Sequence, residues 1–114
     1  MNRRAGLAIG WAAVAVVIYL SVTPQPPQVD VESGDKIGHF LAYGSLAYWF
    51  GQFYFHRTRA AYALGFVAMG IALEFVQGAL GYRSMEVADM IANSLGAASG
   101  WAGATLLPLW RQKA

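Results

Sequence analysis

The sequence predicts an all-α protein, a bundle of four transmembrane helices with both termini in the cytoplasm. Its 114 residues are 57% hydrophobic and only 12% charged, and the mean hydropathy is +0.40. The apolar share exceeds that of soluble domains, and the charged share is about half of their usual level. The length allows a single domain, residues 1–114.

Four apolar runs, each close to the roughly 20 residues that cross a bilayer as a helix, predict the four elements. They cover about residues 5–22, 36–55, 60–80 and 87–110. The first run follows two arginines, as the core of a signal peptide does. It is long for that role, and Pro24 makes a poor cleavage context, so we predict a retained helix. The loop that follows, 23–34, contains three prolines and is predicted to be extended.

Basic residues in the short flanks of these runs predict the orientation. Six lie on one side and two on the other, so the positive-inside rule places the first side, with both termini, in the cytoplasm. The six are Arg3, Arg4, Arg57, Arg59, Arg111 and Lys113, and the two are Lys36 and Arg83. All six acidic residues lie on the opposite, outer side: Asp30, Glu32, Asp35, Glu74, Glu86 and Asp89.

Polar residues at helical spacing predict a pocket just beneath the outer surface. They come from three runs: Asp35, Lys36, His39 and Tyr43 from the second, Glu74 and Gln77 from the third, and Glu86, Asp89 and Asn93 from the fourth, preceded by Arg83. Within each run the spacing of three or four residues places them on one helical face. At ~1.5 Å per residue, Glu74 lies about 9 Å below its outer end, level with Tyr43 and Asn93. An acid that faced lipid would cost roughly 2.5 kcal/mol or more, so we expect these faces to turn inward.

The charges of this set do not balance. Four acids face only Lys36 and Arg83, so a protonated acid, a charged His39 or a bound cation would be needed for neutrality. The chain has no cysteine and no metal-ligand motif, and we predict neither a metal site nor a cofactor. Nucleic acid is not expected as a partner, because the net charge is only +2 and no basic stripe exists.

Three blocks of residues together resemble the VanZ-like family of small integral membrane proteins, which is named for a protein that gives low-level teicoplanin resistance. The blocks are Asp35-Lys36-x-x-His39-Phe40-x-x-Tyr43, then Glu74-x-x-Gln77, then Arg83-x-x-Glu86-x-x-Asp89-x-x-x-Asn93-x-x-Gly96-x-x-x-Gly100. The resemblance implies a multi-pass protein of the bacterial cytoplasmic membrane with its shared polar residues on membrane helices. Gly96 and Gly100 are predicted to let another helix approach closely.

Several functions fit these residues. The first is binding or processing of an amphiphile, such as an envelope lipid or an acylated glycopeptide. In an enzyme, His39 with Glu74 or Asp89 would form the acid–base pair, and Lys36 and Arg83 would hold an anion. The second is a scaffold or homo-oligomer in which the polar residues hold helices together. The third, ion or proton transport, lacks charged residues in the inner halves of the predicted helices.

A weak internal repeat is also present. Asp35-x-Ile37-x-His39-x-Leu41 has the same pattern as Asp89-x-Ile91-x-Asn93-x-Leu95, and each opens a helix that enters from the outside. One interpretation is a pair of parallel helical hairpins related by a pseudo-twofold axis along the membrane normal. Chance similarity is an equally good explanation.

Overall fold

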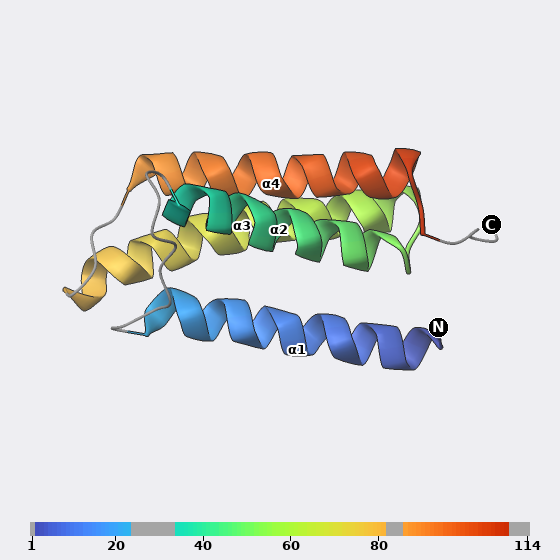
Figure 1. Ribbon diagram of the computed structural model, residues 1–114, viewed down its shortest axis with the longest axis horizontal. Helices are drawn as coiled ribbons and strands as arrows, with labels where there is room; N and C mark the ends of the chain where they lie inside the picture. Colours follow the sequence, from blue (N-terminus) through green and yellow to red (C-terminus); the bar gives the residue numbers. More distant parts are fainter. Residues whose placement is uncertain (1, 24–33, 82–85, 110–114) are drawn as a thin grey trace.

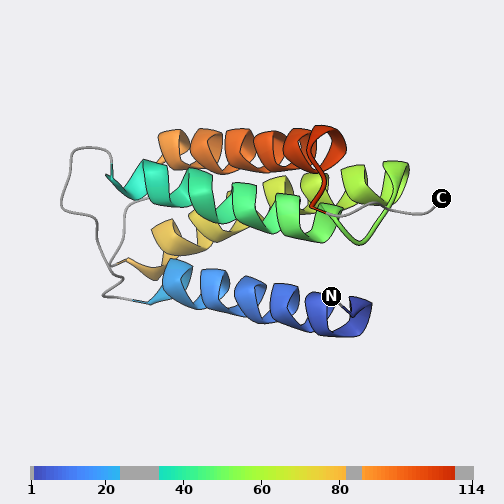
Figure 2. The same ribbon diagram turned by 45° about the vertical axis from the view of Figure 1, so that its right-hand side comes forward.

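A computed structural model of the protein describes residues 2–23, 34–81 and 86–109. Within these ranges the chain forms four helices and no strand: α1 (Arg3–Val22), α2 (Gly34–Gly51), α3 (His56–Leu80) and α4 (Val87–Leu106). The prediction of an all-α protein is therefore confirmed. The helices lie along one another, with α1 and α3 starting at one end of the bundle and α2 and α4 at the other (Figures 1 and 2).

The turn between α2 and α3 lies earlier than predicted. α2 ends at Gly51 and not at 55, and the N–H groups of Gln52 and Phe53 donate to carbonyls three residues back, at 3.0 Å. α3 then begins at His56, so that Arg57 and Arg59, which we expected in the turn, belong to the helix. The apolar run was misleading here because the aromatic residues 53–55 prolong it without being helical.

α4 also ends sooner than predicted, at Leu106 instead of 110. Pro108 has no N–H to donate, and its ring disfavours a helical conformation of the residue before it. That residue, Leu107, accordingly has φ −133° and ψ 61°. Its N–H still donates to the Gly103 carbonyl at 2.7 Å and completes the last turn.

The closest packing in the bundle is a contact between α2 and α4 that we call the glycine seam: Gly44 on α2 with Gly96 and Gly100 on α4. A Cβ atom at Gly96 would collide with the carbonyl oxygen of Phe40, and one at Gly100 with that of Gly44. One at Gly44 would lie 3.2 Å from the Gly96 carbonyl oxygen. Backbone therefore packs directly against backbone along these parallel helices.

α1 packs against α2 and α3 at the edge of the bundle (Figure 1). Only Gly6, Gly10, Val14 and Ser21 of this helix are buried. The indole Nε1 of Trp49 donates to the Gly6 carbonyl at 2.8 Å, and Gly10 leaves room for Trp49 and Phe50. Phe50, which is fully buried, stacks on Tyr62 of α3 with ring centroids 5.1 Å apart. Aromatic rings thus fill the space between α1 and the other helices.

Two of the helices, α1 and α3, are long and apolar enough to cross a membrane. α2 and α4 do not meet this criterion, so a bundle of four spans remains a prediction. The physical reason lies in their sequences, because α2 carries Lys36 and His39, α4 carries Asp89 and Asn93, and both are rich in glycine. These polar groups lower the mean hydropathy of the two helices.

The glycine seam predicts that Gly100→Ala destabilises the protein. The added methyl group meets the Gly44 carbonyl oxygen and lies 2.9 Å from Ala47 Cβ, so the helices must separate. We expect a loss of about 1–3 kcal/mol in the free energy of unfolding, measured by circular dichroism in detergent. Gly38→Ala is the matched control, since a Cβ at Gly38 has no atom within 4 Å. Gly38→Ala should raise the free energy of unfolding by about 0.5–1 kcal/mol. Equal effects of the two changes would contradict close packing at the glycine seam.

Candidate functional site

The candidate site lies at the end of the bundle where α2 and α4 begin and α3 ends (Figure 1). Seven polar residues form what we call the polar cluster: Lys36, His39, Tyr43, Glu74, Glu86, Asp89 and Asn93. Four of them are almost fully buried, with exposed fractions of 2% for Tyr43, 1% for Glu74, 6% for Asp89 and 1% for Asn93. The structure thus brings together acids and amides that the sequence places on three separate helices.

Asn93 links the three helices. Its Oδ1 atom lies 2.8 Å from His39 Nδ1 on α2, and its Nδ2 donates to the Gly70 carbonyl on α3 at 3.5 Å. Because the Gly70 carbonyl requires the amide NH₂, Oδ1 faces His39, and His39 Nδ1 carries the proton. The other ring nitrogen, Nε2, lies 3.8 Å from Asp89 Oδ2. A proton at Nε2 would lie between the imidazole and the carboxylate.

Glu74 fixes the start of α4. Its Oε1 accepts the backbone N–H of Glu86, the residue before α4, at 2.7 Å. Glu86 is the N-cap residue of α4, and its own side chain makes no capping hydrogen bond. A carboxylate at a helix N-terminus satisfies an otherwise unpaired donor and interacts favourably with the helix dipole. A buried acid of α3 therefore accepts a hydrogen bond from the backbone at the start of α4.

The rim of the cluster is more accessible. Lys36 Nζ lies 3.1 Å from Glu86 Oε2 and 3.8 Å from Asp89 Oδ1. The side chains of Lys36 and Glu86 are 36% and 45% exposed, whereas that of His39 is 17% exposed. A ligand would approach the buried acids from this exposed edge, past Lys36 and Glu86.

Negative charge predominates in the described part of the cluster. Glu74 interacts electrostatically with Asp89, Glu86 and His39, and Tyr43 interacts with Glu74. Three carboxyl groups therefore face one lysine and one histidine. Among residues 2–23, 34–81 and 86–109, no three His, Asp or Glu side chains come together in a metal-binding arrangement. The cluster as described is suited to hydrogen-bond donors and to cationic groups.

Gln77, a predicted site residue, makes its described hydrogen bond outside the polar cluster. Gln77 is 2% exposed, but its Nε2 donates to the Ser21 carbonyl at 2.7 Å and ties α3 to α1. Arg83 lies outside the described residues, as does the side chain of Asp35. Gly96 and Gly100 lie on the glycine seam, one turn and two turns beyond Asn93.

Gly70 is a site residue that the sequence analysis missed. A Cβ atom at this position would lie 2.8 Å from Asn93 Nδ2 and 3.1 Å from Tyr43 Cε2. Because Gly70 has no side chain, α3 can approach the cluster closely enough for the Gly70 carbonyl to accept a hydrogen bond from Asn93. The only signal in the sequence is a small residue one turn before Glu74 on the same face.

These features describe a small helical bundle with polar side chains buried at one end and with two helices, α1 and α3, that are long and apolar enough to cross a membrane. The chain matches the family described as VanZ/LLP1 over residues 5–108, and it belongs to that family. No curated protein and no solved structure matches it.

The His39–Asn93 contact predicts energetic coupling between α2 and α4. In a double-mutant cycle, His39→Ala and Asn93→Ala should couple by about 0.6–1.7 kcal/mol, the range found for hydrogen bonds between membrane helices. The readout is the free energy of unfolding in detergent. Ser94→Ala provides the control cycle with His39→Ala, because the Ser94 hydroxyl donates within α4, to Met90 O at 2.9 Å. Additive effects in both cycles would show that His39 and Asn93 do not interact.

Proposed function

We propose that all four helices cross the bacterial cytoplasmic membrane, with the polar cluster on the extracytoplasmic side. α2 and α4 have 18 and 20 residues, or about 27–30 Å at ~1.5 Å per residue, which matches the hydrocarbon thickness. They lie along α1 and α3, and the acids of the cluster are at the opposite end of the bundle from Arg3, Arg4, Arg57 and Arg59. The positive-inside rule then gives the orientation.

We further propose that the cluster binds an amphiphile whose polar head carries cationic or hydrogen-bond-donating groups. The observation that carries this proposal is the near-complete burial of two acids, Glu74 and Asp89, next to an exposed rim. Buried ionisable groups within a membrane bundle are costly and are a mark of functional sites. An acylated glycopeptide or a lipid-linked envelope precursor has a head of this kind.

The surroundings of the cluster suit the tail of such a ligand. Ile37, Phe40 and Leu41 on α2 are 52%, 38% and 58% exposed, and Ile91 and Leu95 on α4 are 54% and 56% exposed. These apolar side chains flank the polar cluster on the outside of the bundle. An acyl chain would lie against them in the bilayer while the head reaches the carboxyl groups.

The main alternative is a structural role, in which the cluster only holds the helices together. The hydrogen bonds from His39 to Asn93 and from Glu86 to Glu74 favour it, because each joins two helices. Transport has less support, since Leu46, Phe50 and Phe66 are buried outside the cluster, and the polar side chains that are buried outside it among the described residues, Ser21, Gln52 and Gln77, are uncharged. For processing of a bound ligand, His39 and Asp89 are the pair available for proton transfer.

The binding proposal predicts that Glu74→Gln and Asp89→Asn weaken ligand binding while the protein still folds. Each change keeps the size and an acceptor oxygen and removes the charge. With teicoplanin as the probe and the protein in nanodiscs, we expect affinity to fall about tenfold or more, as expected when a buried ion pair with a cationic group is lost. A glycopeptide without the acyl chain is the ligand control and should bind more weakly. Equal binding by all variants would reject the site, and loss of folding in both would favour the structural role.

The topology is testable because the natural chain has no cysteine. Single cysteines replace Thr58, near the start of α3, and Val87, the first residue of α4; both positions are exposed and lie at opposite ends of the bundle. In intact spheroplasts, a membrane-impermeant maleimide should label Val87→Cys only. Thr58→Cys should react after permeabilisation. Labelling of both positions from the outside would contradict four spans.

A further inference from the structure

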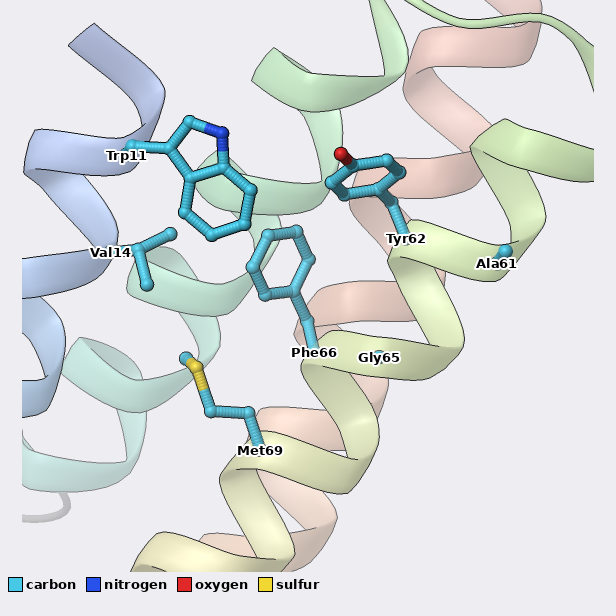
Figure 3. A pocket seen from close by; sticks show the side chains of 7 residues that line it. All are labelled: Trp11, Val14, Ala61, Tyr62, Gly65, Phe66 and Met69. Carbon is cyan, nitrogen blue, oxygen red and sulfur yellow. The ribbon is translucent and has the colours of Figure 1, made fainter. Parts of the chain in front are cut away.

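A groove between α1 and α3 is formed by the middle of α1 and the first half of α3. It has a cavity volume of about 400 Å³ and is lined by Trp11 and Val14 of α1 and by Ala61, Tyr62, Gly65, Phe66 and Met69 of α3. Figure 3 shows Trp11 and Phe66 facing each other across it, with Met69 beside them. All the lining residues are apolar or aromatic, and Trp11 is 52% exposed, so the groove opens to the surroundings of the bundle.

Each helix that lines this apolar groove has an exposed arginine near its start, Arg4 on α1 and Arg57 on α3. Arg4 precedes Trp11 by seven residues, two helical turns or about 10 Å along the same face of α1. Arg57 precedes Ala61 by four residues, one turn or about 6 Å along α3. α1 and α3 start at the same end of the bundle (Figure 1), and the two arginines lie in the first turns of these helices.

Two further arginines that the structure describes at this end, Arg3 and Arg59, contact other residues of the protein. The Arg3 guanidinium lies 5.0 Å from the centre of the Tyr54 ring, and Arg59 donates to the carbonyls of Gly51 and Tyr54, both at 3.1 Å. The Tyr62 hydroxyl, at the edge of the groove, donates to the Tyr54 hydroxyl at 3.1 Å. This tyrosine pair connects the apolar groove to the arginines.

The described helices carry no acidic residue at this end of the bundle. No Asp or Glu occurs in residues 1–29, 36–73 or 90–114, so all four arginines lie far from any acid of the helices. Basic residues at the cytoplasmic membrane surface attract anionic lipid headgroups. An apolar groove with two exposed arginines, two turns and one turn before its first lining residues, matches both parts of one molecule.

We propose that the groove between α1 and α3 binds an anionic phospholipid of the cytoplasmic leaflet, with an acyl chain along Trp11 and Phe66 and the phosphate at Arg4 and Arg57. Lipid tails are as apolar as the groove, so the acyl contact alone gives little preference over bulk lipid. The arginines bind the phosphate through charge-assisted hydrogen bonds, and they favour an anionic lipid because its head group has no cation that offsets the phosphate charge. This inference rests on the membrane orientation proposed above, but it does not depend on what the polar cluster binds.

The groove can be filled without disturbing the helix. A Cβ atom at Gly65 has no atom within 4 Å, so Gly65→Leu places its side chain in open space. Gly38 on α2 is equally open and lies at the other end of the bundle, which makes Gly38→Leu a matched control. Arg4→Gln combined with Arg57→Gln removes the charge and leaves the groove unchanged.

Native mass spectrometry of the full chain in detergent tests the proposal, with phosphatidylglycerol and phosphatidylcholine of identical acyl chains as probes. Wild type should retain phosphatidylglycerol preferentially, and the double arginine variant should lose that preference by about tenfold or more. Gly65→Leu should reduce retention of phosphatidylglycerol, whereas Gly38→Leu should not. Circular dichroism checks that every variant is folded.

Two outcomes would overturn the proposal. The first is retention of phosphatidylglycerol by Gly65→Leu, or by the double arginine variant, at the level of wild type. The second is a wild-type dimer that Gly65→Leu dissociates, which would show that a second copy of the chain occupies the groove. Loss of teicoplanin binding in Glu74→Gln would affect neither result, so the two sites are tested separately.

Discussion

The close approach of α2 and α4 is the constraint on which the polar cluster depends. At the glycine seam the helices touch through backbone atoms of Gly44, Gly96 and Gly100, and no side chain separates them. Because the two helices are parallel and start at the same end, their first turns meet as well. Lys36 and His39 therefore lie against Asp89 and Asn93. A wider spacing would leave these groups out of hydrogen-bonding range.

Much of the architecture could be predicted from the sequence, because apolar runs bounded by charges and prolines determine where helices form. The spacing of polar residues also identified the faces that meet at the cluster, and His39 and Asn93, which match in the internal repeat and are 54 positions apart, contact each other directly. The periodicity of polar residues shows which face of a helix is polar, however, and not which residues the side chains on that face contact. It therefore could not show that Gln77 bonds to α1, or that Gly70 provides the carbonyl for Asn93. The turn after α2 was misplaced because aromatic residues in a turn have the same hydropathy as those in a helix.

The two ends of the bundle differ in chemistry. At one end carboxyl groups are buried between helices, and at the other arginines lie around aromatic rings. Phe50, Phe66 and Leu46 fill the interior between them and keep the two ends apart. Each end can therefore interact with a different kind of polar group, although the chain has only 114 residues.

The bond from Glu86 N–H to Glu74 also bears on the biosynthesis of the chain. α3 leaves the ribosome before α4, so for a time its acid lacks the backbone donor that it has in the finished bundle. If α3 and α4 both cross the membrane as proposed, an unpaired carboxylate would be expensive in hydrocarbon, and α3 alone would be a poor substrate for lateral release from a translocation channel. Release together with α4, as a helical hairpin, avoids that cost.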